Sequence, residues 1–208
     1  MATKKILLVE GKDDVHVFRA IFGQRQLPHL SEIKDHEGYP HLLEAIPVRL
    51  VESEVQAVGI VLDADTDLAG RWAAVRHRLA AAGYVGVPTA PESRGVVLEP
   101  PAATLLPRVG AWLMPNNQVP GILEDFLRFL VPPTDALFVY ADQVVNGIPA
   151  PLRLFTPGDR PKALIHTWLS WQAEPGRPLG TSITAGFLKH ATPEVDALVA
   201  WLRRLFFA

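Results

Sequence analysis

Acidic residues that directly follow apolar runs constrain the fold of this chain more than any other feature. An uninterrupted Val/Ile/Leu run between turn residues is typical of a strand buried on both faces of a parallel sheet. The carboxyl ends of such strands meet at one edge, where open α/β sheets bind their ligands. The sequence therefore predicts an acidic site at that edge. The runs and their acidic successors are Ile6–Val9 with Glu10, Asp13 and Asp14, Gly59–Leu62 with Asp63, Asp65 and Asp67, and Trp112–Met114 with the later Glu124 and Asp125.

Composition excludes several classes of protein. The 208 residues are 49% hydrophobic and 20% charged, which is typical of a folded globular chain. Lys and Arg number 20 against 22 Asp and Glu, so the chain lacks the overall basic excess of a nucleic-acid coat. No run approaches the roughly 18 apolar residues of a membrane span, and no secretory signal is visible. Without cysteine there is no disulfide or thiolate zinc site. We expect a cytoplasmic protein with no membrane partner.

Strand and helix signals alternate in the order βαβαβα at the start of the chain. Prolines then separate two short strands, and helical periodicity dominates the rest. We expect an α/β fold with a mostly parallel, Rossmann-type sheet flanked by helices. An α/β domain over residues 1–131 would carry an α-helical C-terminal extension over 132–208, packed on the same core. The expected strands are about 4–10, 31–36, 55–62, 95–99 and 108–114, and the expected helices about 14–22, 40–50, 69–82, 120–131, 135–146, 160–172 and 194–207.

The predicted edge brings carboxylates together. Glu10 closes one strand, and Asp14 lies one helical turn further on. Asp63 and Asp65 are two residues apart, so the alternation of a strand predicts that they point the same way. Two carboxylates about 4 Å apart repel by about 4 kcal/mol at an effective dielectric of about 20. A hard divalent cation would compensate for that repulsion, and phosphoryl transfer is the reaction class that such sites serve.

These residues resemble the Toprim pattern, which is shared by topoisomerases, bacterial primases, small ribonucleases and the overcoming-lysogenization-defect nucleases. The Toprim-like part covers roughly residues 3–130 and rests on Glu10–Asp14, Asp63–Asp65 and Glu124–Asp125. The chain is also similar to a group of uncharacterised stand-alone prokaryotic proteins with a Toprim-like core. That closer resemblance covers nearly the whole chain and rests on Gly59–Leu68, Trp112–Asn116 and Ile165–Gln172.

The resemblance implies a metal-dependent phosphodiester hydrolase that acts on nucleic acid, either DNA or RNA, with Mg²⁺ or Mn²⁺. It implies that Glu10 is a general acid/base or metal ligand, and that Lys162 stabilises charge developing on phosphate. The nuclease branch is usually joined to an ATPase domain. This chain has no Gly-x-x-x-x-Gly-Lys-Ser/Thr loop, which leaves room for a separate ATPase partner. The implied metal ligands are Glu10, Asp14, Asp63, Asp65, Asp67, Glu124 and Asp125.

Other interpretations stay open. A non-catalytic nucleic-acid-binding or regulatory module would use the same acidic cleft. Asp63–Asp67 also resembles the nucleophile motif of haloacid-dehalogenase-type phosphatases, which leaves Glu10 unexplained. The apolar Leu205–Phe207 end belongs either to the core or to a homo-oligomer contact. His166 lies on an apolar helix face, where we expect a hydrogen-bonded packing residue.

Overall fold

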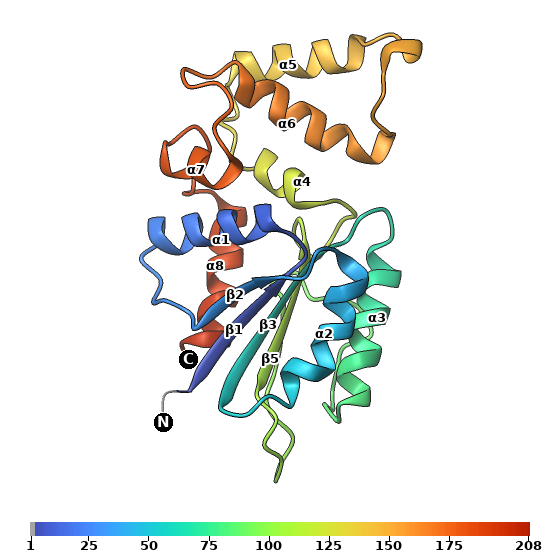
Figure 1. Cartoon of the computed structure of the whole chain (residues 1–208), viewed down its shortest axis with the longest axis vertical. Coiled ribbons are helices and arrows are strands. Elements are labelled where there is room, and N and C mark those ends of the chain that lie inside the picture. Colours follow the sequence, from blue (N-terminus) through green and yellow to red (C-terminus); the bar gives the residue numbers. More distant parts are fainter. Residues whose placement is uncertain (1–2) are drawn as a thin grey trace.

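A five-stranded sheet with helices on both faces forms the centre of the computed structural model, which describes residues 3–208 (Figure 1). The strands are β1 (Lys4–Val9), β2 (Glu32–Asp35), β3 (Val55–Asp63), β4 (Val96–Leu98) and β5 (Arg108–Met114). Their order in the sheet is β2-β1-β3-β5-β4. All neighbours pair in parallel except β4, which runs antiparallel to β5. The predicted α/β class, with a mostly parallel sheet flanked by helices, is confirmed.

The helices follow the order that the sequence predicted, with one addition. They are α1 (Lys12–Gln24), α2 (Tyr39–Leu50), α3 (Leu68–Ala81), α4 (Leu123–Arg128), α5 (Ala136–Gly147), α6 (Arg160–Ser170), α7 (Leu179–Thr184) and α8 (Pro193–Phe206), with 3-10 turns at Ala150–Leu152 and Pro157–Asp159. The short helix α7 was not predicted. Across residues 3–208, no helix combines the length and the apolar character needed to cross a membrane.

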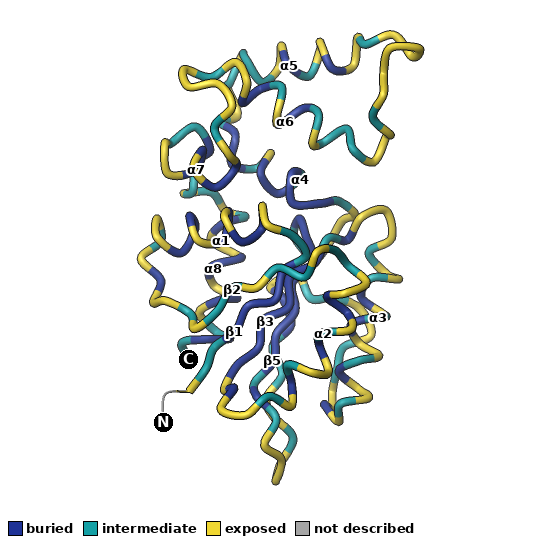
Figure 2. The backbone as a smooth tube through the Cα atoms, in the orientation of Figure 1, coloured by how far each residue is buried: buried dark blue, intermediate teal, exposed yellow. Residues whose placement is uncertain are grey.

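Two hydrophobic layers cover the two faces of the sheet. Side chains alternate along each strand, so Leu8 and Ile60 pack beneath α2 and α3, whereas Leu7 and Val61 pack beneath α1 and α8. The central strands are therefore buried along most of their length (Figure 2).

Helix α8 packs directly against the middle of the sheet. A Cβ atom added to Gly59 of β3 would lie 2.9 Å from Phe206 Cζ, and one added to Gly110 of β5 would lie 2.9 Å from Leu205 Cδ2. Glycine at both positions allows this close approach. The apolar end of the chain at Leu205 and Phe206 therefore belongs to the core.

The chain changes direction across the sheet between β1 and β3. From β1 it passes through α1 to β2, and α2 then returns it to β3 on the other side of β1. Because α1 and α2 cover opposite faces, the connections diverge above the carboxyl ends of β1 and β3 (Figure 1). Such a switch point is where open α/β sheets form their binding crevice.

Helices α4, α5 and α6 form a helical cap above this edge. Helix α4 lies between the sheet and the neighbouring helices α5 and α6 (Figure 1). Inside the cap, Trp168 Nε1 donates a hydrogen bond to Asp135 Oδ1 at 3.3 Å, and Arg160 forms an ion pair with Asp142. These contacts tie α6 to α5 and fix the side of α6 that faces the sheet.

Candidate functional site

A carboxylate joins the ends of β1 and β3. Glu10 directly follows β1, and its Oε1 accepts a hydrogen bond of 2.9 Å from the backbone N–H of Asp63. The parallel register pairs Leu8 with Ile60, which brings the two strand ends to the same level. The structure thus places Glu10 and Asp63 together, at the edge where the sequence predicted them.

The first turns of α1 and α4 each place a buried carboxylate beside this pair. Asp14 lies in the first turn of α1, is 8% exposed, and accepts a hydrogen bond of 3.1 Å from the backbone N–H of Gly11. Glu124 lies in the first turn of α4 and is 4% exposed. Glu10 and Asp63 are half-buried. We call Glu10, Asp14, Asp63 and Glu124 the inner carboxylates.

All four inner carboxylates line one cavity of about 480 Å³, the carboxylate cavity. Its wall also includes Lys162 and His166 from α6. The remaining charged lining residues are Lys12, Asp13, Asp35 and Glu37. Seven carboxylates therefore face two lysines and one histidine, which leaves the cavity strongly negative when its acids are ionised.

Removal from water raises the pKa of every inner carboxylate, and repulsion from the other inner carboxylates adds to the effect on Asp14 and Asp63. Burial, opposed by the Gly11 N–H and reinforced by Glu10 and Glu124, raises the pKa of Asp14 to about 7. The pKa of Asp63 lies well above its usual range, through burial first and then through Asp14, Glu10 and Glu124. Burial also raises the pKa of Glu10 and of Glu124. The charges of Glu10 and Glu124 thus both act on Asp14 and on Asp63.

The chemistry of this site suits a hard divalent cation. Within residues 3–208, no group of three or more acidic or histidine side chains is already arranged to hold a metal ion. The inner carboxylates nevertheless offer an all-oxygen donor set, which is the kind that Mg²⁺ and Mn²⁺ prefer. A cation among them would offset the cost of burying their negative charges and the repulsion between them. The inner carboxylates are therefore the side chains that would hold such an ion.

Asp65 does not line the cavity. Strand β3 ends at Asp63, and Asp65 has a φ of 52°, so the alternation of a strand no longer sets its direction. Its N–H donates to the carbonyl of Gly121 at 2.8 Å, and its Oδ2 accepts a hydrogen bond of 2.9 Å from Arg71 Nη2. The pairing of Asp63 with Asp65 expected from alternation is thus corrected to a pairing of Asp63 with Glu10.

Asp67 and Asp125 also lie outside the residues that line the cavity. Asp67 is the N-cap of α3, where its Oδ1 accepts a hydrogen bond of 2.8 Å from the N–H of Gly70. Asp125 Oδ2 accepts a hydrogen bond of 3.1 Å from the N–H of Ile122 and closes the start of α4. Both side chains satisfy helix ends. Their placement gives no support to the metal-binding role that the resemblance implied.

His166 is a candidate site residue that the sequence reasoning missed. It was expected to be a packing residue, but it is exposed and lines the carboxylate cavity. The buried face of α6 consists instead of Leu164, Ile165, Trp168 and Leu169. Lys162 and His166 are four residues apart, so they share the remaining face of the helix. That spacing is the signal in the sequence that could have identified His166.

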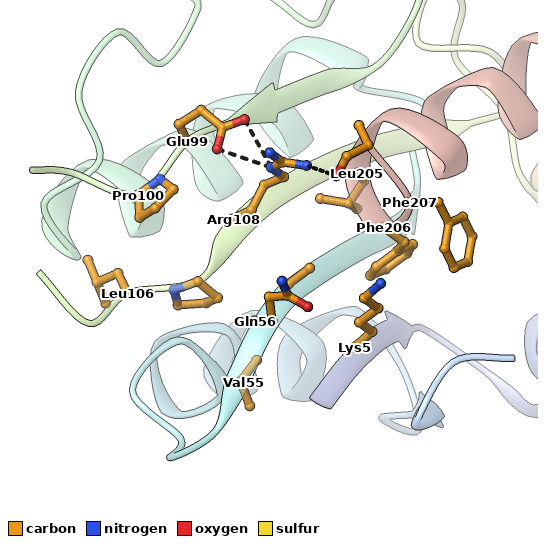
Figure 3. Close-up of a pocket in the computed structure, with 13 residues that line it drawn as sticks. Lys5, Val55, Gln56, Glu99, Pro100, Leu106, Arg108, Leu205, Phe206 and Phe207 are labelled. Carbon is orange, nitrogen blue, oxygen red and sulfur yellow. Dashed lines mark hydrogen bonds and ion pairs between the residues drawn. The ribbon is translucent and has the colours of Figure 1, made fainter. Parts of the chain in front are cut away.

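A second cavity, of about 380 Å³, lies at the amino ends of the strands and differs in character (Figure 3). Arg108 Nε lies 2.9 Å from Glu99 Oε1, and Arg108 Nη1 donates to the carbonyl of Arg204 at 3.3 Å. Lys5 Nζ lies 5.1 Å from the centre of the Phe207 ring. The cations of this amino-end cavity thus already have partners within the chain. The carboxylate cavity is therefore the candidate functional site.

Comparisons with known proteins identify a family. Neither the search of curated proteins nor the search of solved structures found a match. A family described as "Protein of unknown function (DUF3226)" matches residues 4–207, from the start of β1 through α8. The match includes the sheet, the helical cap and every residue of the carboxylate cavity. The chain therefore belongs to the DUF3226 family.

Proposed function

We propose that the protein is a Mg²⁺- or Mn²⁺-dependent phosphodiester hydrolase that acts on nucleic acid. The observation that carries this proposal is the convergence of the inner carboxylates on one cavity above β1 and β3. The order of Glu10, Asp63 and Glu124 along the chain, which resembles the Toprim pattern, supports the same reaction. That resemblance also favours nucleic acid over other phosphodiesters.

The chain supplies groups for proton transfer and for charge stabilisation. A bound divalent cation would neutralise phosphate charge and lower the pKa of an attacking water. Glu10 accepts the Asp63 N–H through Oε1, so its other oxygen, Oε2, would take a proton from that water. The Lys162 ammonium in the same cavity would stabilise negative charge developing on the phosphate oxygens.

The proposal extends to the cellular setting. We place the protein in the cytoplasm, since nucleic acid is accessible there and the chain contains no cysteine to stabilise it outside the cell. A separate ATPase would be its partner, because the related nuclease branch usually has an attached ATPase domain. A co-purification experiment with tagged protein would test this: an ATPase partner should be retained at physiological salt.

Cleavage assays test the activity directly. Purified protein would be incubated with single-stranded, double-stranded and supercoiled DNA and with RNA, in Mn²⁺, in Mg²⁺ and in EDTA. We expect cleavage that requires the divalent ion. A paired Glu10→Gln/Asp63→Asn variant should lose it, because it removes two of the inner carboxylate charges.

One control variant and three contrary outcomes make the assay decisive. Glu99→Gln neutralises a carboxylate of the amino-end cavity and should cleave like the wild type. Cleavage by the paired variant at the wild-type rate would contradict the proposal, since the activity would then come from a contaminant. Metal-dependent binding without turnover would favour a non-catalytic module. Phosphate release from small monoesters, with nucleic acid intact, would favour the phosphatase interpretation.

A further inference from the structure

We propose that His166 donates a proton to the leaving oxygen when the phosphodiester is cleaved. This inference rests on the proposed function and deepens it by assigning the group that protonates the leaving oxygen. When the bond between phosphorus and the leaving oxygen breaks, that oxygen departs as a strongly basic alkoxide. A positioned acid that protonates it speeds the step by about 10²- to 10⁴-fold.

The fold holds His166 at the cavity. Helix α6 buries Ile165 and Trp168 on its other side, and Trp168 Nε1 is fixed by its hydrogen bond to Asp135. The anchored helix leaves Lys162 and His166 on the face that lines the cavity. The His166 imidazole and the Lys162 ammonium therefore line the same wall of the carboxylate cavity.

The imidazole stands beside negative charge. His166 and Lys162 both lower the pKa of Glu124, which burial raises. Of the described residues that line the cavity, His166 is the only histidine. An imidazole is the side chain that most readily gives and regains a proton near neutral pH. The other basic side chains that line the cavity, Lys12 and Lys162, are amines, and an ammonium group is ordinarily a much weaker acid than an imidazolium.

The proposed step is balanced without a further reactant. Water attacks phosphorus, one of its protons passes to Glu10, and the bond from phosphorus to the leaving oxygen breaks. His166 gives its proton to that oxygen, which departs as an alcohol. The imidazole then takes a proton from solvent, and Glu10 returns one to solvent.

Substrates with a bridging sulfur test this assignment. One oligonucleotide would carry an ordinary phosphodiester, and matched ones would carry sulfur in place of the bridging 3′ or the bridging 5′ oxygen. A thiolate departs without a proton, so it makes a general acid unnecessary. We expect His166→Ala to slow cleavage of the ordinary substrate by about 10²-fold or more, and to slow cleavage at one of the two sulfur positions by less than about threefold. His77→Ala, an exposed histidine on α3, should cleave all substrates like the wild type.

Three results would overturn the inference. Equal slowing on the ordinary and on both sulfur substrates would show that His166 does not protonate the leaving group. A loss of more than tenfold in Mn²⁺ affinity, measured by titration calorimetry on His166→Ala, would make it a metal ligand instead. If the wild type cleaves none of the substrates, the proposed function fails and the inference fails with it. Wild-type cleavage combined with either of the first two results removes the inference alone.

Discussion

The two ends of the parallel sheet carry cavities of similar size but different charge balance. At the amino ends, Arg108 is paired with Glu99, and Lys5 lies over an aromatic ring. At the carboxyl ends, seven carboxylates face two lysines and one histidine, and the inner carboxylates have raised pKa values. Unbalanced buried charge destabilises a fold unless a ligand compensates for it, so such groups cluster at functional sites. We therefore propose the carboxyl edge as the functional part of the molecule.

The largest expected effect is on the stability of the metal-free protein. The pKa of Asp14 is about 7 in the folded protein against an ordinary value of 3.8. Because the folded pKa is raised, this group's stabilising contribution is complete below about pH 3.8 and is lost as the pH rises through about 7. The difference corresponds to about 4 kcal/mol. We expect the free energy of unfolding to fall by up to that amount between about pH 4 and pH 7, measured by urea unfolding in EDTA.

Asp14→Asn should reduce this dependence on pH, because the asparagine side chain does not ionise. Glu99→Gln, at the amino-end cavity, should keep the wild-type dependence of the free energy of unfolding on pH. If wild type and Asp14→Asn showed the same dependence on pH, the contrast between the two cavities would be wrong.

Among the acidic side chains, the inner carboxylates should set the metal affinity, and those that cap helices should not. Asp63→Asn should weaken Mn²⁺ binding by at least about 10- to 100-fold, the loss typical of disturbing groups around a metal. Asp125→Asn should leave the affinity within about twofold, because Asp125 caps α4 outside the cavity and asparagine also accepts the capping hydrogen bond. Titration calorimetry at pH 8 measures both. Equal losses in the two variants would contradict the geometry.

Lys162→Met should change binding and turnover in opposite directions. Removing a cation from the cavity should tighten Mn²⁺ binding about twofold or more, because Lys162 and the metal compete for the same negative charge. Cleavage should slow by about tenfold, less than the loss of a buried oxyanion donor, because the Lys162 side chain is exposed. Parallel measurements of Mn²⁺ affinity and kcat would check this. Weaker metal binding would show that Lys162 helps to organise the carboxylates instead.

The smallest effect is expected at Asp65. Asp65→Asn suits the left-handed backbone and keeps an oxygen for Arg71, but removes the charge of a half-exposed ion pair. The free energy of unfolding should fall by about 1 kcal/mol or less, with no change in Mn²⁺ affinity. Denaturant unfolding and calorimetry separate the two quantities. A loss of metal binding would restore the pairing of Asp63 with Asp65 that strand alternation predicts.

The sequence predicts the sheet and the proximity of Glu10 and Asp63 for a simple physical reason. The apolar runs that become β1, β3 and β5 are long enough to be recognised as buried strands, and parallel pairing brings their ends to one edge. Glu10 and Asp63 directly follow or close such runs, so the direction of their strands fixes where they lie. Glu124 joins them because β5 ends at the same edge and α4 begins nine residues later.

Residues whose position depends on tertiary contacts or on one backbone angle escape such reasoning. Asp65 leaves the strand through a positive φ that no local pattern announces. Helix α7 is short, and it packs so closely on α1 that a Cβ on Gly180 would lie 2.5 Å from the His16 carbonyl oxygen. His166 reaches the site only because α4, α5 and α6 stack above the sheet.

Crystals soaked in Mn²⁺ give the most direct test of the central claim. Anomalous scattering would locate the ion independently of any assumption about its ligands. We predict a manganese peak in the carboxylate cavity, coordinated by oxygens of Glu10 and Asp63 and by at least one of Asp14 and Glu124, with Asp65 still paired to Arg71. A peak held by Asp65 and Asp67, or no peak in this cavity at saturating Mn²⁺, would contradict the account.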